Sequence, residues 1–241
     1  MQRALAFAMA ALGLSLVPLH ARAQETIYLV RHAEKAAGGA LLDDAKLPLT
    51  LFGEKQAGLL ADQLDDAGIT AVYYSQSDPA FDPERKGESI LRTKATACPL
   101  IKRLREQGKP VTAYDLVYPN WIGNWRDRAE VMVPFAEQAV ETIRRNHRGR
   151  SDKAILIVGH ENTVPAMIRQ LAKTQLFLLD PETDISRPHE FMGPKEFGLL
   201  YEVNLKAATP KEFLRITRYA ASSSTAAPAT VLDPVERAGE K

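Results

Sequence analysis

The chain has 241 residues, with 31 Lys and Arg against 30 Asp and Glu and a formal net charge of +1 at pH 7. Nucleic acids and anionic membranes are held by net positive fields, so this balance argues against both as main partners. Cys98 is the only cysteine, which excludes an intramolecular disulfide and favours a small, buried apolar role on a helix.

The first 23 residues have the three parts of a secretory signal peptide. A basic start at Arg3 leads into a nearly continuous apolar run from Ala4 to Val17, and Ala21-Arg22-Ala23 supplies a small-x-small cleavage site. The alternative is a membrane anchor, but the apolar run is shorter than the ~18 residues that a spanning helix needs. We expect cleavage after Ala23, a periplasmic or secreted location, and no membrane contact after cleavage. Losing Arg3 and Arg22 takes the net charge from +1 to −1.

The remaining chain suits one domain with a substantial core. Short β-branched and aromatic runs alternate with segments of helical periodicity, which is typical of an α/β domain. In chain order we expect strands at 26–30, 71–75, 111–115, 154–159, 198–205 and 213–219, and helices at 51–66, 88–107, 128–146 and 162–172. The expected fold over residues 24–220 has three layers, with helices on both faces of a mainly parallel central sheet.

The end of the chain and one internal segment differ from this pattern. The last two predicted strands are neighbours in sequence and are expected to form an antiparallel hairpin at the sheet edge. Residues 76–86 are polar, contain Pro79 and Pro83, and predict a loop excursion. Residues 221–241 are rich in Ala, Ser, Thr and Pro and predict a disordered tail.

Two histidines occupy matching positions on different predicted strands. His32 follows Arg31 at the end of the first strand, and His160 follows Gly159 at the end of the fourth. In open α/β sheets, ligands bind at the carboxyl ends of strands. A single histidine there is usually structural, but two in matched positions, one beside an arginine, favour a reactive site.

Five sequence motifs occur in the order of a known family. Arg31-His32-Ala33-Glu34 and Val158-Gly159-His160 with Asn162-Thr163 each follow an apolar strand; the others are Leu49-Thr50 with Gly53 and Gln56-Ala57, Val72-Tyr73-Tyr74-Ser75, and Arg92-Thr93-Lys94-Ala95-Thr96-Ala97. Together they resemble the histidine phosphatase superfamily, which includes the cofactor-dependent phosphoglycerate mutases and many small phosphatases. The resemblance runs from about residue 26 to 172. It implies a phosphoglycerate mutase-like fold, a phosphate-binding arginine at Arg92, and no metal.

The chemistry of phosphoryl transfer gives each of these residues a role. The transferred group spreads negative charge over its equatorial oxygens, so it needs cationic hydrogen-bond donors. Arg31, Arg92 and protonated His160 would bind those oxygens. His32, neutral and held in one tautomer by a backbone acceptor, would attack phosphorus and form a phosphohistidine that water hydrolyses. We expect a phosphomonoester hydrolase that acts on a small phosphorylated substrate without a cofactor or metal.

The proton donor is where this chain departs from the family. Many relatives have a glutamate just before a Gly-x-Trp segment, whereas residues 118–122 before Gly123-Asn124-Trp125 contain no acid. Glu161 beside His160 resembles the donor of the acid phosphatase and phytase branch, although it could instead be a charge favoured by the helix dipole. Asp115, at the end of the third predicted strand, is the second candidate. Glu34 could either orient a histidine or cap the loop.

Two other functions stay open. A protein that binds phosphoryl ligands with weak or no turnover is favoured by the missing glutamate. A phosphomutase would need a closed site and a phosphorylated cofactor, which suits an exported protein poorly. Residues 76–89 are an insertion relative to the family and are expected to lie over the site entrance. The sequence indicates neither the natural substrate nor the oligomeric state.

Overall fold

The computed structural model describes residues 26–36, 48–77, 90–118, 128–148, 154–173, 197–221 and 231–232. The predicted signal peptide, residues 78–89 of the insertion and the Trp121–Trp125 segment lie outside these residues. Within the described part of the chain, no helix has the length and apolar character needed to cross a membrane.

One sheet forms the middle layer, with strand order β3-β2-β4-β1-β5-β6-β7. Four adjacent strands pair with one another in parallel: β1 (Thr26–Arg31), β2 (Ile69–Ser77), β3 (Thr112–Tyr118) and β4 (Ala154–Gly159). The strands β5 (Leu199–Asn204), β6 (Leu214–Arg218) and β7 (Val231–Leu232) are added antiparallel. The α/β prediction is confirmed, but the sheet is mixed: one half is parallel and the other antiparallel.

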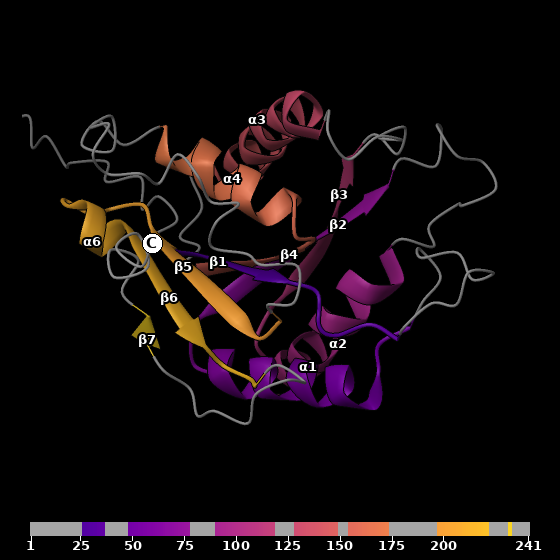
Figure 1. Ribbon diagram of the computed structural model, residues 1–241. Coiled ribbons are helices and arrows are strands. Elements are labelled where there is room, and N and C mark those ends of the chain that lie inside the picture. Colours follow the sequence, from indigo (N-terminus) through magenta and orange to yellow (C-terminus); the bar gives the residue numbers. More distant parts are fainter. Residues whose placement is uncertain are drawn as a thin grey trace, which may run out of the picture.

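Helices cover both faces of this sheet. α1 (Leu51–Leu64) and α2 (Ile90–Glu106) lie on one face, and α3 (Arg128–His147) and α4 (Thr163–Ala172) lie on the other (Figure 1). Thr50 is the N-cap of α1, where its hydroxyl accepts a hydrogen bond from the Gly53 N–H at 2.9 Å. The three-layer arrangement is therefore confirmed.

The structure differs from the prediction near the end of the chain. A short helix, α6 (Pro210–Phe213), connects β5 and β6 and was not expected. β5 and β6 are the expected antiparallel pair. The hairpin is not at the edge, however, because β7 pairs with β6 through Ile216 and Thr217. The two residues of β7 fall in the segment predicted to be disordered, and most of that segment lies outside the described residues.

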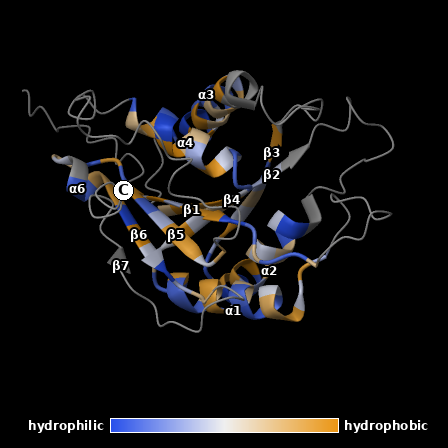
Figure 2. Cartoon of the chain, viewed as in Figure 1, coloured by the Kyte–Doolittle hydropathy of each residue, from blue (hydrophilic) through white to orange (hydrophobic). Residues whose placement is uncertain are grey.

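The core has two halves, one on each side of the sheet. Leu29, Tyr73 and Ile157 pack with α3 and α4, whereas Val30, Val72 and Leu156 pack with α1 and α2. Figure 2 shows hydrophobic residues along the central strands and on the helix faces turned toward them. Both faces of these strands are buried, which is why the strands are nearly continuous apolar runs. A shift of one residue would move each side chain into the other half of the core.

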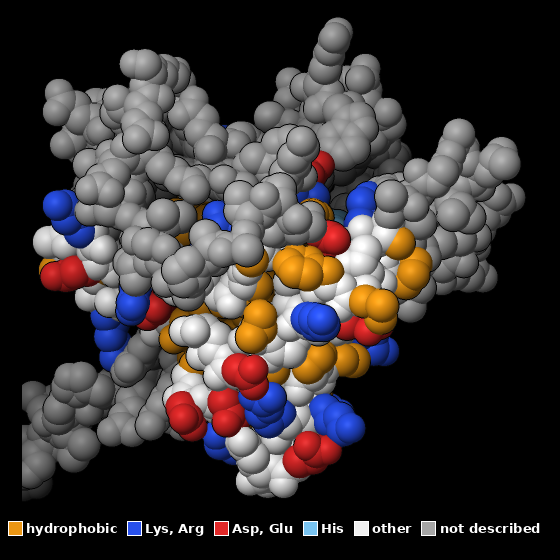
Figure 3. Space-filling model, turned by 60° about the horizontal axis from the view of Figure 1, so that its bottom comes forward, with side chains coloured by type: hydrophobic (Ala, Val, Ile, Leu, Met, Phe, Trp, Pro, Cys, Tyr) orange, Lys and Arg blue, Asp and Glu red, His pale blue; other side chains and the backbone are white. Residues whose placement is uncertain are grey.

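The surface near α1 and α2 carries no single sign of charge. Figure 3, in which the α1 side comes forward, shows basic and acidic side chains interspersed with apolar ones. Cys98 of α2 is exposed, so the prediction of a buried role is wrong. Ala97, Leu100 and Leu104 supply the core face of this helix, and the position after Ala97 turns away from it.

Candidate active site

The order of the strands brings the two predicted histidines together. β1 and β4 are adjacent and parallel, and Arg31 is paired in register with Gly159. The N–H of His32 donates to the carbonyl of Gly159 at 2.9 Å, which continues the ladder one residue beyond the strand. His32 and His160 therefore begin from neighbouring positions at the same edge of the sheet.

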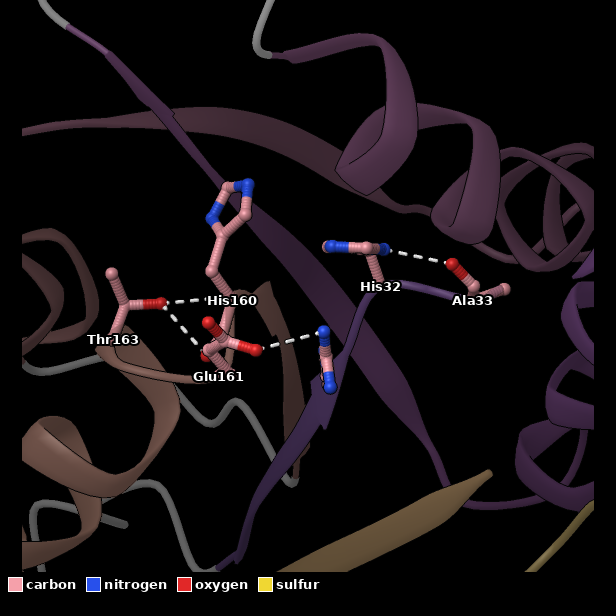
Figure 4. A network of polar contacts seen from close by, with 6 residues as sticks. His32, Ala33, His160, Glu161 and Thr163 are labelled. Atoms are coloured by element: carbon pink, nitrogen blue, oxygen red, sulfur yellow. Dashed lines mark hydrogen bonds and ion pairs between the residues drawn. The ribbon is translucent and has the colours of Figure 1, made fainter. Parts of the chain in front are cut away.

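The two imidazoles form the centre of the candidate site. Their ring centroids are 5.2 Å apart, with 69° between the ring planes. His32 is 3% exposed and His160 is 9% exposed. Figure 4 shows both rings, with Glu161 beside His160 and the Ala33 carbonyl beside His32. The two histidines therefore lie close together, as expected from their matching positions at the ends of two strands.

The surroundings of His32 hold it neutral in a single tautomer. Its Nδ1 lies 2.7 Å from the carbonyl oxygen of Ala33. A carbonyl only accepts, so Nδ1 carries the hydrogen and Nε2 keeps its lone pair. Burial, followed by the charges of His160 and Arg92, lowers the pKa of His32 well below its ordinary value, although the Ala33 hydrogen bond acts in the opposite direction. The ring is therefore an uncharged nucleophile or base at neutral pH.

Both predicted arginines are buried at this edge, Arg31 at 7% exposure and Arg92 at 6%. Arg31 Nη2 is 2.9 Å from Glu161 Oε2, and its guanidinium lies 4.3 Å from the ring centroid of Phe197. The Phe197 ring is also near His32, with centroids 5.9 Å apart. Arg31 is thus in contact with a carboxylate on one side and with an aromatic face on another.

Arg92 is held near His32 by the first turns of α2. The Thr96 hydroxyl donates to the Arg92 carbonyl at 2.8 Å and accepts from the N–H of Ala33 at 2.8 Å. The Thr93 hydroxyl donates to the carbonyl of Ser75 at 3.1 Å. Two buried threonines therefore fasten this helix to the ends of β1 and β2, and the charge of Arg92 acts on His32.

The end of β4 is a compact turn. The N–H of His160 donates to the Thr163 hydroxyl at 2.8 Å. A Cβ at position 159 would lie 2.5 Å from Thr163 Oγ1 and 2.9 Å from Val164 Cγ2, so only glycine fits without a shift. Ser75 Oγ lies 2.9 Å from His160 Nδ1. The turn and the neighbouring strand together orient the second imidazole.

The two candidate proton donors have different positions. Glu161 is 29% exposed and contacts the site through Arg31. Asp115 is exposed and lies in the middle of β3, in register with Tyr74, so the prediction that it ends a strand is wrong. Two strands separate β3 from β1, which at ~4.8 Å per strand is about 14 Å. Glu161 is therefore the acid that the structure brings to the histidines.

Glu34 fastens the loop after β1 to α1. Its Oε1 accepts from the Thr50 hydroxyl at 3.2 Å, and its N–H donates to Gln56 Oε1 at 2.9 Å. The Gln56 amide nitrogen donates in turn to the carbonyl of Ala221 at 2.9 Å. Of the two roles considered for Glu34, these contacts support loop capping.

Sequence reasoning missed three residues at this edge. Ser75 and Thr96 fall inside the motifs that carry the family resemblance, but neither was assigned a function. Phe197 lies beyond the resemblance and had no sequence signal. Among the described residues, no group of three or more His, Cys, Asp or Glu is placed to hold a metal ion.

Comparisons with known proteins give a family and a fold. The model of the histidine phosphatase superfamily, branch 1, matches residues 27–181. A search of curated proteins found no match. A solved structure named mycobacterial hydrolase 1 is similar at a TM-score of 0.51 and 14% identity, covering 83% of this chain and 99% of that one. At this identity the likeness supports the fold alone.

Two further solved structures are similar at lower TM-scores. A mycobacterial glucosyl-3-phosphoglycerate phosphatase matches at 0.49 and 14% identity, covering 82% of this chain and 99% of its own. The protein histidine phosphatase SixA, complexed with tungstate, matches at 0.44 and 17% identity, covering 79% and 93%.

Proposed function

This chain belongs to the histidine phosphatase superfamily, and we propose that it is an exported phosphomonoester hydrolase that works through a phosphohistidine on His32. The observation that carries the proposal is the state of His32. A buried, neutral imidazole with its hydrogen on Nδ1 presents a lone pair on Nε2. In the proposed reaction that lone pair attacks phosphorus in line with the leaving alkoxide.

The cationic groups around His32 support binding of the phosphoryl oxygens. Arg31 and Arg92 are both buried, where their charges are screened less than on the surface. His160, at 5.2 Å between ring centroids, can donate a further hydrogen bond. These groups would neutralise the charge that develops in the transition state.

Glu161 is the proposed general acid, because the turn after β4 carries it directly after His160 and against Arg31 (Figure 4). Its Oε2 lies 2.9 Å from Arg31 Nη2, one of the groups proposed to bind the phosphoryl oxygens. In the proposed reaction, the protonated carboxyl group gives its proton to the leaving alkoxide, and the resulting carboxylate takes a proton from the water that hydrolyses the phosphohistidine, which restores the starting carboxyl group.

Hydrolysis of p-nitrophenyl phosphate by wild type and His32→Ala tests the proposal. We expect loss of the nucleophile to lower kcat by more than ~10³-fold. Rapid acid quench followed by alkaline stabilisation is expected to trap an acid-labile phosphoenzyme in wild type only. Turnover that does not depend on His32 would overturn the assignment. Phosphate binding without any turnover would instead indicate the binding protein.

A comparison of leaving groups tests Glu161. In Glu161→Gln, we expect hydrolysis of an alkyl phosphate to fall ~10²-fold or more, whereas p-nitrophenyl phosphate, with its stable leaving group, is affected far less. Equal loss on both substrates would argue against a proton-donating role.

Export is supported by the pattern of residues 1–23. Expression of the full chain in a bacterial host, with N-terminal sequencing of the periplasmic and medium fractions, is expected to give a mature chain that begins at Gln24. Retention of Met1 in the cytosol would contradict it.

A further inference from the structure

The two histidines of the site differ in what their Nδ1 atoms contact. His32 Nδ1 faces the carbonyl oxygen of Ala33 at 2.7 Å. His160 Nδ1 faces the hydroxyl oxygen of Ser75 at 2.9 Å. A carbonyl oxygen only accepts hydrogen bonds, whereas a hydroxyl can either accept or donate. The two imidazoles are therefore restricted in different ways.

The Ser75 hydroxyl is compatible with both charge states of His160. When the ring is charged, Nδ1–H donates to Ser75 Oγ, and Nε2 also carries a hydrogen. When the ring is neutral, the hydroxyl can rotate and donate to Nδ1, which places the remaining hydrogen on Nε2. A carbonyl in the same place would force the neutral ring to hold its hydrogen on Nδ1. Two bare Nε2 atoms, from His32 and His160, would then face the phosphoryl oxygens.

We propose that Ser75 is a positioning residue that keeps His160 a hydrogen-bond donor at Nε2 whether the ring is charged or neutral. This inference rests on the proposed function, because the hydrogen bond is directed at a phosphoryl group. It assigns the two histidines opposite roles: the carbonyl contact makes His32 a nucleophile, and the hydroxyl contact makes His160 a donor.

The position of Ser75 is well fixed for this task. It is 1% exposed and follows Tyr74, which is paired with Val158 of β4. Its carbonyl accepts from the Thr93 hydroxyl of α2 at 3.1 Å. A Cβ on Gly159 would come 3.7 Å from Ser75 Oγ, so the hydroxyl lies against the turn that carries His160.

The charged and titratable groups of the described site come from three elements. His32 and Arg31 belong to the end of β1, Arg92 belongs to α2, and Glu161 follows His160 in the turn. Substitution of Ser75 changes none of these groups chemically, so its effect can be compared with theirs.

The first experiment compares pH–rate profiles of wild type, Ser75→Ala and Ser75→Thr. Thr70→Val is the matched control, because the Thr70 hydroxyl lies on the same strand and donates to the Ala154 carbonyl at 3.3 Å, away from the histidines. We expect Ser75→Ala to lose a few-fold activity at acid pH, where His160 is charged. The deficit should grow to ~10-fold or more at alkaline pH, because the neutral ring is no longer directed to donate.

The variants give distinct outcomes. Ser75→Thr keeps the hydroxyl and is expected to restore the shape of the wild-type profile, and Thr70→Val is expected to leave it unchanged. A deficit of Ser75→Ala that is the same at every pH would show a merely structural role and overturn the proposal.

The second experiment reads the tautomers directly and needs no turnover. Ring ¹⁵N shifts of labelled wild type with bound inorganic phosphate are expected to show neutral His160 protonated at Nε2 and neutral His32 protonated at Nδ1. Signals are assigned by their loss in His160→Gln and His32→Gln. Neutral His160 protonated at Nδ1 would overturn the inference, even if Ser75→Ala does not fold. Failure of the proposed function would appear separately, as turnover independent of His32.

Discussion

The parallel and antiparallel halves of the sheet contribute different things to the site. β1 and β4, with α2 packed beside them, supply the histidines and the arginines. The antiparallel half supplies supporting contacts. The Phe197 ring lies against the Arg31 guanidinium, and the Ala221 carbonyl accepts a hydrogen bond from Gln56 of α1. The family match ends at residue 181, before β5 begins. The histidines and arginines of the candidate site therefore come from the half that the family match covers, and these supporting contacts come from the half that lies beyond the match.

The largest effect that would sharpen this contrast concerns Arg92. Replacement by Lys keeps the charge but loses the guanidinium fork that would bind two phosphoryl oxygens in the proposed function. We expect kcat/KM for p-nitrophenyl phosphate to fall by ~10²-fold. Arg103→Lys is the matched control on the same helix, because Arg103 is half-exposed and paired with Asp62, and it should leave activity unchanged. Equal losses of activity in the two variants would contradict a phosphate-binding role for Arg92.

The second prediction concerns the backbone of the parallel half. Gly159→Ala would force the turn open, because its Cβ would overlap Thr163 and Val164. We expect a loss of ~2–4 kcal/mol in the free energy of unfolding, measured by denaturant titration. Gly58→Ala in α1 is the control, since no atom lies within 4 Å of a Cβ built there. It should stabilise the protein by up to ~1 kcal/mol, and a neutral Gly159→Ala would refute the tight packing.

The third prediction follows from the lowered pKa of His32. At pH values below 6.5, the ordinary pKa of histidine, the unfolded chain binds a proton at this residue. The folded chain binds that proton only when the pH falls to the lower pKa of the buried ring. The free energy of unfolding therefore falls as pH drops through that window, by at most ~1.4 kcal/mol per pH unit from this group. His32→Gln should reduce this acid sensitivity, as measured by denaturant titration from pH 7 to pH 5. If His32→Gln left the dependence of the free energy of unfolding on pH unchanged, the acid sensitivity would come from a residue other than His32.

The smallest effect is expected in the antiparallel half. Phe197→Leu keeps an apolar contact under Arg31 but removes the aromatic face. A cation–π contact contributes about 0.5–1 kcal/mol at partly exposed sites, so we expect steady-state kinetics to show a ~2–5-fold rise in KM with the turnover rate nearly unchanged. A turnover rate lowered by two orders of magnitude would contradict the contrast between the two halves of the sheet, because it would indicate that Phe197 contacts the reacting atoms.

The sequence predicted the parallel half well because its signals are local. Apolar strands ending in His32 and His160 define their own faces, and Thr50 begins α1 as its side chain requires. The ends of β3 could not be located in the same way. Its polar and aromatic residues alternate less clearly on an edge strand, and Asp115 was placed at the end of a strand that continues to Tyr118.

The contacts missed by the sequence join distant residues. Thr96 is 63 positions from Ala33, and Ser75 is 85 positions from His160. A serine or threonine in a strand or helix has no pattern that names its partner, so these roles follow only from the packed structure. The same is true of Phe197, which reaches Arg31 from the other half of the sheet.

The position of β1 in the sheet has a consequence for when the molecule can fold. Its two neighbours are far along the chain, since Thr26 pairs with Ala154 on one side and with Asn204 on the other. Closing such long loops delays pairing and slows folding. A chain emerging from the ribosome with its N-terminus first cannot fix the strand that leads to His32 until β4 has been made. This late assembly suits a polypeptide that must be threaded across a membrane while still unfolded, as the proposed export would require.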